Sequence, residues 1–258
     1  GELAMTCCVS FDVGDGQRIG VNTASRAELL SSMDSHLASR RGFSVATLNL
    51  DHIVKLRAGE KFRAAYAAHT HVVADGNPIV WVSQLSRRAV KLVPGCELID
   101  PASALAVRHG APVALLGASE QALSRAGDRL LAQHPGLEIA ARIAPAWGFD
   151  PEGAEADECI EALRRSGARI VFLALGAPKQ EIFAARAQAA LPEVGFLSIG
   201  AGIDFLAGTQ RRAPRIMRRL ALEWLWRAAS EPRRLAQRYA RCALLMPGLT
   251  MDAMSGRL

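Results

Sequence analysis

Short apolar runs alternate with longer stretches of helical spacing along most of this sequence, and that alternation limits the fold more than any other feature. The runs cover residues 43–50, 71–74, 112–116, 169–175 and 195–199. Apolar runs of this length, bounded by polar residues or glycine, are typical of buried strands. A strand followed by a helix, repeated, is the pattern of a mostly parallel sheet with helices on both faces. We therefore predict an α/β fold with a Rossmann-like sheet flanked by helices.

The residues before the first of these runs predict a hairpin and a helix. Apolar residues at 11–13 and 18–21 flank a turn that contains Gly14 and Gly16, which is typical of a β-hairpin. Ser25 followed by Glu28 forms a capping box, the side-chain pattern that satisfies free amides at a helix start. We expect an amphipathic helix from Ser25 to about Arg40.

The composition excludes several classes of protein. The chain has 258 residues, of which 50% are hydrophobic and 22% charged, so it can bury a sizeable core. At about 150 residues per domain, one large domain or one domain with an appendage is favoured. Five cysteines without a Cys-x-x-Cys pair argue against a disulfide framework and a thiolate zinc site. We expect a reducing, cytosolic environment.

Neither a membrane span nor an export signal is expected. The longest apolar stretches, such as 242–251, fall short of the roughly 20 residues that cross a bilayer. Residues 1–5 lack the basic and apolar segments of a signal peptide, and Gly1 before Met5 resembles a tag remnant.

The positive charge is concentrated at the end of the chain. Residues 209–258 contain eleven arginines and three acids, a net charge of +8, whereas residues 1–208 contain 20 basic and 22 acidic residues, a net charge of −2. We therefore divide the chain into an α/β core over 1–208, which holds the active-site crevice, and a basic helical appendage over 209–258. A charge asymmetry of this size indicates an anionic partner for the appendage.

Two amphipathic helices are predicted in the appendage. One begins at Pro214 and covers 215–226. Its apolar half carries Ile216, Met217, Leu220, Ala221, Trp224 and Leu225, and its opposite half carries Arg215, Arg218 and Arg219. The other follows Pro232, with an apolar stripe of Leu235, Tyr239, Cys242 and Met246.

The arginine-rich appendage has three interpretations. A solvated, ion-paired surface would need more than three acids. A nucleic-acid-binding segment is an alternative, although no known nucleic-acid-binding motif occurs. Tryptophans set between arginines favour an anionic membrane surface, because indoles prefer the headgroup zone and arginines pair with anionic lipid. We assign membrane docking to Arg211, Arg212, Arg215, Arg218, Arg219 and Trp226. These helices could equally pack on the core or on a second copy in a homo-oligomer.

Polar residues collect where the predicted strands end, which is where an open α/β sheet binds its ligand. Asp75 follows the 71–74 run, from where its carboxylate could face a ligand and act as a general base. The equally weighted alternative is a turn-forming Asp-Gly pair, because Gly76 follows. Thr47 and Asn49 alternate along the 43–50 run, so their side chains share one face and could contact a sugar or phosphate.

Glycine-containing loops follow the other runs and favour a nucleotide ligand. Glycine lets backbone amides approach an anion at the start of a helix, and lysine adds positive charge there. The residues concerned are Gly117, Gly176, Pro178, Lys179, Gln180, Glu181, Gly200, Gly202 and Asp204. Each loop alone is weak evidence, and none has a Walker A pattern.

Other site chemistries have less support. His69 and His71 could offer two metal ligands, but no third ligand follows at a telling distance, so we interpret the pair as structural. No Asp-x-Asp pair occurs, so we expect Lys, Arg and backbone amides to neutralise a leaving diphosphate instead of a bound divalent ion. A dinucleotide-dependent oxidoreductase would need a Gly-x-Gly-x-x-Gly after the first strand, and the sequence has none.

Taken together, these segments resemble the WecG/TagA/CpsF glycosyltransferases. The matching pieces are residues 47–49 with 51–54, residues 74–76, the Gly-Ala-Pro-Lys-Gln-Glu segment 176–181, residues 200–208, and residues 212–214 followed by 222–227 and 231–234. They occur in order from about residue 18 to 245. Each piece is modest alone, but the ordered set is highly specific.

The resemblance implies an inverting transfer of a sugar, without a required metal or other cofactor. The donor would be a UDP-sugar and the acceptor a polyprenyl-diphosphate-linked saccharide on the inner face of the bacterial cytoplasmic membrane. Asp75 would be the general base, and Thr47, Asn49, Asn77 and Lys91 would contact acceptor or sugar. The 176–181 and 200–204 loops would hold the nucleotide and diphosphate. The appendage would dock on the membrane and close over the site, and nucleic acid would not be a partner.

One segment departs from the pattern of the family. Its members commonly carry Arg-Val-x-Gly-x-Asp after the catalytic Asp, and the corresponding residues here are Leu-Val-Pro-Gly-Cys-Glu at 92–97. Leucine thus stands at the arginine position, with Lys91 beside it. Lys91 could supply a point charge in place of the arginine, or a donor or acceptor contact differs. Relatives transfer N-acetylmannosamine, its uronic acid, or glucose, so the sugar is left open.

Overall fold

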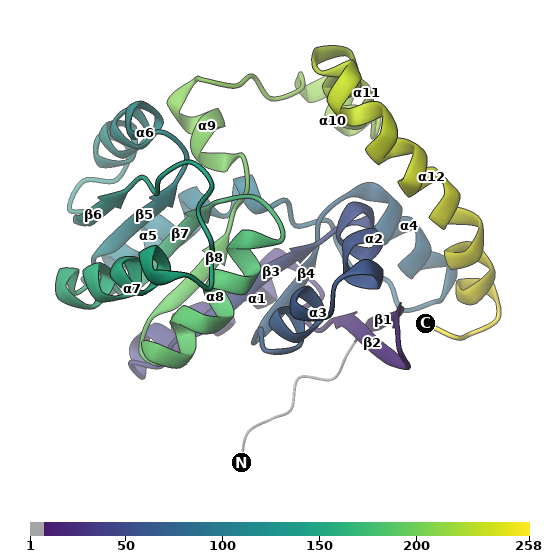
Figure 1. Cartoon of the computed structure of the whole chain (residues 1–258), viewed down its shortest axis with the longest axis horizontal. Coiled ribbons are helices and arrows are strands. Elements are labelled where there is room, and N and C mark those ends of the chain that lie inside the picture. Colours follow the sequence, from purple (N-terminus) through teal and green to yellow (C-terminus); the bar gives the residue numbers. More distant parts are fainter. Residues whose placement is uncertain (1–7) are drawn as a thin grey trace.

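The computed structural model describes residues 8–258, so the expectation for residues 1–5 lies outside the described residues. Its centre is a six-stranded, fully parallel sheet in the order β4-β3-β8-β7-β5-β6 (Figure 1). The strands are β3 (Phe43–Leu48), β4 (His71–Ala74), β5 (Val113–Gly117), β6 (Ile139–Ile143), β7 (Ile170–Ala174) and β8 (Gly195–Ser198). The predicted α/β class, with a parallel sheet flanked by helices, is confirmed.

Helices cover both faces of this sheet and bury its alternating side chains. One face packs against α1 (Arg26–Ala38), α5 (Ile99–His109), α6 (Glu120–Gln133) and α9 (Gly202–Ala207). The other packs against α2 (Leu50–Ala58), α3 (Glu60–Ala67), α4 (Asn77–Leu85), α7 (Ala154–Ser166) and α8 (Lys179–Ala190). Val45 faces the first layer and Ala46 the second, as the two-residue period of a strand requires.

The N-terminal hairpin and helix form as predicted. Strands β1 (Val9–Gly14) and β2 (Gln17–Val21) pair antiparallel. Ser25 caps α1, because its hydroxyl accepts a hydrogen bond from the Glu28 amide (3.2 Å). The Glu28 carboxylate in turn accepts from the amide of Ala24 (2.9 Å), one residue before the cap.

Two strand predictions needed correction. The 43–50 run ends as a strand at Leu48, because Asn49 caps α2 and Leu50 is already helical. Strand β6 at the sheet edge was not predicted. Its residues Ile-Ala-Ala-Arg-Ile are half-buried or exposed, so they lack the continuous apolar run that marks a central strand.

The C-terminal segment differs more from its prediction. The helix expected over 215–226 is broken into α10 (Arg215–Arg219) and α11 (Glu223–Ser230), because Ala221 adopts a left-handed conformation with φ 59°. The second expected helix is present as α12 (Pro232–Met254). It crosses from α11 along α4 and α2 to the hairpin (Figure 1), and its Cys242 and Leu249 are buried in the same core as the hairpin. Within residues 8–258, no helix is long and apolar enough to span a membrane.

Candidate active site

Three neighbouring strands bring the predicted catalytic residues together. Strands β4, β3 and β8 are adjacent and parallel, so their carboxyl ends meet at one edge of the sheet. Asp75 directly follows β4, and its amide donates to the carbonyl of Leu48 at the end of β3 (2.8 Å). Thr47 lies in β3 opposite Val73 and is buried. Asp75 and Thr47 therefore lie at the strand ends, where the sequence predicted the ligand-binding crevice.

A turn after the sheet edge holds the Asp75 carboxylate. Val93 donates its amide to the carbonyl of Ala74 (2.7 Å), so the chain runs beside β4 into a short 3-10 helix, η1 (Gly95–Glu97). The Gly95 amide donates to Oδ2 of Asp75 (3.3 Å). A Cβ on Gly95 would lie 3.3 Å from Cγ2 of Thr47 and 3.2 Å from the carbonyl oxygen of Ser198. Only glycine fits without displacing a neighbour, so the turn packs directly on Thr47 and presents its amide to Asp75.

The surroundings of Asp75 favour a group that can accept a proton near neutral pH. Burial raises its pKa to about 6, although the Gly95 amide opposes this. Glu223 of the C-terminal segment raises the pKa further, while Arg212 and Arg227 lower it. Taken as a whole residue, Asp75 is half-buried. A carboxylate with this pKa suits general-base chemistry better than an ordinary exposed aspartate.

The other predicted sugar-binding residues have different positions. Asn49 uses its side-chain oxygen to cap α2, accepting from the His52 amide (2.8 Å), which leaves its amide nitrogen for other partners. Asn77 is the first residue of α4, half-buried and two residues after Asp75. Lys91 is exposed, and no described contact joins its ammonium group to Asp75. Among the predicted residues, Thr47 and Asp75 both lie against the turn that contains Gly95.

Two residues of the 176–181 loop that were predicted to bind the nucleotide are buried in the protein interior. Gln180 and Glu181 are buried in the first turn of α8, after a cis peptide bond between Ala177 and Pro178. Gln180 donates its side-chain amide to Oε1 of Glu181 (3.1 Å), and burial raises the pKa of Glu181 to about 7. The other side-chain oxygens of both residues lack a described hydrogen-bond partner. Gly176 is exposed, and Lys179 is half-buried at the start of α8.

Two of the remaining loop glycines, Gly117 and Gly202, are closely packed. Gly117 ends β5 with φ 107°, and a Cβ there would lie 2.5 Å from the carbonyl oxygen of Ala174. Gly202 begins α9 against Ile99, with 2.8 Å between its Cβ position and that side chain. Gly200 has φ 55° and open space around its Cβ position. Asp204 accepts from the hydroxyl of Thr209 (2.8 Å) and so fixes the chain that leaves α9.

The sequence of the chain matches a known family over nearly its whole length. A family model described as "Glycosyl transferase WecG/TagA/CpsF family" matches residues 16–256. The chain belongs to this family. WecG/TagA/CpsF proteins are glycosyltransferases of cell-surface polysaccharide biosynthesis. The matched region runs from the hairpin through α12, so the basic C-terminal segment is part of the family pattern.

Sequence reasoning missed a buried polar group beneath this WecG/TagA/CpsF site. His52 of α2 and Tyr66 of α3 share a hydrogen bond between Nδ1 and the phenol oxygen (2.7 Å). Burial lowers the pKa of His52 to about 3, so its ring is neutral at pH 7. Burial, with Glu181 and Asp75 nearby, raises the pKa of Tyr66 well above its ordinary value. Residues 51–54 contributed to the family resemblance, but no role was predicted for His52 or for Tyr66.

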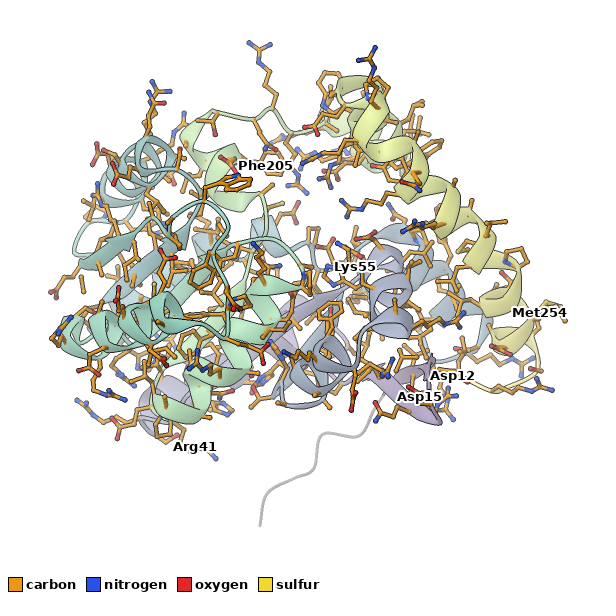
Figure 2. The ribbon with its side chains drawn as sticks, viewed as in Figure 1. Asp12, Asp15, Arg41, Lys55, Phe205 and Met254 are labelled. Carbon is orange, nitrogen blue, oxygen red and sulfur yellow. The ribbon has the colours of Figure 1, made fainter. Side chains whose placement is uncertain are left out.

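The structure also shows acidic partners for the C-terminal arginines. Glu97 accepts from Nη1 of Arg212 (2.8 Å) and lies 3.5 Å from Nη1 of Arg218. Asp51 pairs with Arg238 of α12 (2.9 Å) and with Lys55 of α2 (3.0 Å). The Lys55 ammonium also donates to the carbonyl of Ala177 (3.3 Å); Figure 2 labels this side chain. Acids of the α/β core thus hold the segment at two points around the WecG/TagA/CpsF site.

No metal-binding cluster accompanies these residues. Residues 8–258 hold no group of three or more His, Cys, Asp or Glu side chains placed to share a metal ion. His69 and His71 are both buried and use their rings in hydrogen bonds, to the carbonyl of Ala65 (2.7 Å) and the hydroxyl of Ser32 (2.7 Å).

Proposed function

We propose that this protein is an inverting glycosyltransferase that moves a sugar from a UDP-sugar to a polyprenyl-diphosphate-linked saccharide. The family supplies the reaction class, and one observation supports the assignment of the base. Asp75 stands at the carboxyl edge of the sheet, with one oxygen held by the Gly95 amide and a pKa of about 6. That combination fits the deprotonation of an acceptor hydroxyl.

In the proposed reaction, the Asp75 carboxylate takes the proton of the acceptor hydroxyl as that oxygen forms a bond to C1 of the donor sugar. The bond from C1 to the diphosphate oxygen breaks, and UDP leaves with the electron pair. Because the acceptor attacks from the face opposite the leaving group, the anomeric configuration inverts. No covalent bond forms between the sugar and the protein, so the reaction needs one carboxylate as the base and no second carboxylate as a nucleophile.

The donor is proposed to lie along the glycine loops, and its charge to be met without a metal ion. Gly117, Gly176, Pro178, Gly200 and Gly202 allow backbone close to a nucleotide, and Lys179 adds a cation at the start of α8. Arginines and backbone amides can stabilise the charge that develops on a diphosphate. On the acceptor side, Thr47, the free amide group of Asn49, Asn77 and Lys91 are proposed sugar contacts.

Membrane docking is proposed for the outer surface of α10 and α11. Arg215 and Arg219 are exposed and have no described ion pair. The segment of α10 and α11 exposes four large apolar side chains, Ile216, Leu220, Trp224 and Leu225. Cations beside exposed aromatic and aliphatic groups suit an anionic membrane surface, here the inner face of the bacterial cytoplasmic membrane. The other predicted docking residues differ, since Arg212 and Arg218 pair with Glu97, and Arg211 and Trp226 line a cavity.

The reaction is tested by measuring UDP release. The purified protein is incubated with each of four donors, UDP-linked N-acetylmannosamine, glucose, glucuronic acid and N-acetylglucosamine, with and without a prenyl-diphosphate-linked sugar. We expect one donor to release UDP only when the acceptor is present. Release that is independent of the acceptor, or release from no donor by folded protein, would count against the proposal.

A further inference from the structure

A cavity lies between α9, the segment that follows it, and helices α11 and α12. Phe205, Trp226 and Leu235 form its apolar wall. Arg211 and Arg227 also line this cavity. Figure 2 labels Phe205, which belongs to α9 and lies below the segment that leads from α9 to α10. The Trp226 indole donates to the carbonyl of Arg211 (3.4 Å), which ties the aromatic wall to that segment.

The charges lining this cavity are not balanced. Two carboxylates border it, but Glu223 lies 3.5 Å from Nε of Arg212, and Glu231 lies 2.5 Å from Nε of Arg234. Neither Arg211 nor Arg227 has an ion pair with a carboxylate in residues 8–258. An apolar wall next to two uncompensated guanidinium groups suits an amphiphilic anion, and arginine binds phosphate in a bidentate manner.

Residues of the cavity lining act on Asp75, and their sequence neighbours belong to the proposed membrane surface. The lining residues Glu223 and Arg227 both act electrostatically on Asp75. Trp224 and Leu225, which neighbour Trp226 on α11, are exposed on the outer surface. A charged ligand in the cavity would therefore bind next to groups that influence Asp75, on a helix whose other side is exposed.

We infer that this cavity binds the diphosphate and the first isoprene units of the lipid-linked acceptor. Arg211 and Arg227 pair with the phosphates, and Phe205, Trp226 and Leu235 contact the start of the prenyl chain. The inference rests on the proposed function and adds the place of the acceptor lipid. The donor also carries a diphosphate, so the test has to separate the two sources.

Direct binding of farnesyl diphosphate to the full chain tests the inference without any sugar transfer. Trp226 lines the cavity, so its fluorescence should change on titration, and Trp226→Phe should remove that change. We expect Arg211→Ala and Arg227→Ala each to weaken binding by about 10- to 100-fold, because each removes a charge-assisted contact to phosphate. Arg227→Lys should retain part of the affinity.

Two controls separate this result from general charge effects. Arg241→Ala removes an exposed arginine of α12 outside the cavity and should bind farnesyl diphosphate as the wild type does. Farnesol, which lacks phosphate, should compete poorly, and UDP should not displace the ligand.

Equal binding by wild type and both alanine variants, with unchanged circular dichroism, would overturn the inference. Displacement by UDP would overturn it too and assign the arginines to the donor. Failure of sugar transfer would leave this binding result standing.

Discussion

Asp75 combines a fixed orientation with an unusual pKa, and both follow from its neighbours. The Gly95 amide holds one carboxylate oxygen, while burial beside the sheet edge disfavours the charged form. The charges of Glu223, Arg212 and Arg227 partly cancel at this carboxylate. The C-terminal segment thus helps to set the protonation of a residue that lies more than a hundred positions earlier in the chain.

The raised pKa predicts an acidic limb in the pH profile of the reaction. A base must be ionised, and Asp75 with a pKa of about 6 is progressively protonated as pH falls through that value. We expect kcat/KM to be level above about pH 7 and to fall about tenfold per pH unit below about pH 5.5. The measurement is kcat/KM from about pH 4.5 to 8, with circular dichroism at each pH as the control for unfolding. A profile that stays level down to about pH 4.5 would contradict this assignment.

At the scale of elements, close backbone contacts between strand ends shape the crevice. Gly117 at the end of β5 approaches Ala174 of β7 in a conformation with φ 107° that side chains rarely adopt. The position of Gly117 in the sequence suggested a contact with the nucleotide. The structure shows in addition that a larger residue there would collide with Ala174, whether or not a ligand is bound. Other glycines, such as Gly167 after α7, have a positive φ but open space around them.

Alanine substitutions at Gly117 and Gly167 should therefore lower the free energy of unfolding by different amounts. Gly117→Ala should lower the free energy of unfolding by roughly 3 kcal/mol, since it adds an overlap with backbone to a strained conformation. Gly167→Ala, the matched control, should cost only about 1 kcal/mol for its left-handed backbone. Urea denaturation of both variants measures the two values. Equal losses would show that the contact with Ala174 does not constrain the sheet.

The sequence allowed the prediction of most elements, because central parallel strands are apolar throughout and helix starts carry polar caps such as Ser25. It did not reveal β6, whose edge position removes the need for apolar residues, or the break at Ala221, which has no glycine or proline to mark it. Asp75 and Thr47 could be predicted from their places at strand ends. Glu97 could not be identified as the partner of Arg212, because that contact depends on how the C-terminal segment folds back.

At the scale of the whole molecule, the excess positive charge lies in the C-terminal segment, and two of its arginines, Arg212 and Arg227, act on Asp75. Some of the arginines in 209–258 pair with Glu97 and Asp51 of the α/β core, and others remain exposed on α10 and α12. The inward-facing arginines hold the segment near Asp75, while the outward-facing ones are available to a partner. Under the proposed function, this one segment would connect the membrane surface to the general base Asp75.

The docking proposal predicts a salt-sensitive loss of membrane binding. Replacing Arg215 and Arg219 together with alanine should weaken binding to anionic vesicles by roughly 30-fold at low salt, given about 1 kcal/mol per basic residue near the surface. The effect should shrink at high salt. The matched control replaces Arg88 and Arg125, two exposed arginines of the α/β core. Vesicle co-sedimentation measures both pairs, and equal losses in the two pairs would argue against docking through α10.

The role of Asp75 is tested by acceptor-dependent UDP release from Asp75→Asn and from the wild type, with the active donor and saturating acceptor. We expect the variant to be slower by about 10²- to 10⁴-fold, the usual contribution of a positioned general base, with donor binding and thermal unfolding close to wild type. Asp128→Asn, an exposed carboxylate on α6, should keep full activity. Turnover by Asp75→Asn within about twofold of wild type would contradict the central claim that Asp75 deprotonates the acceptor.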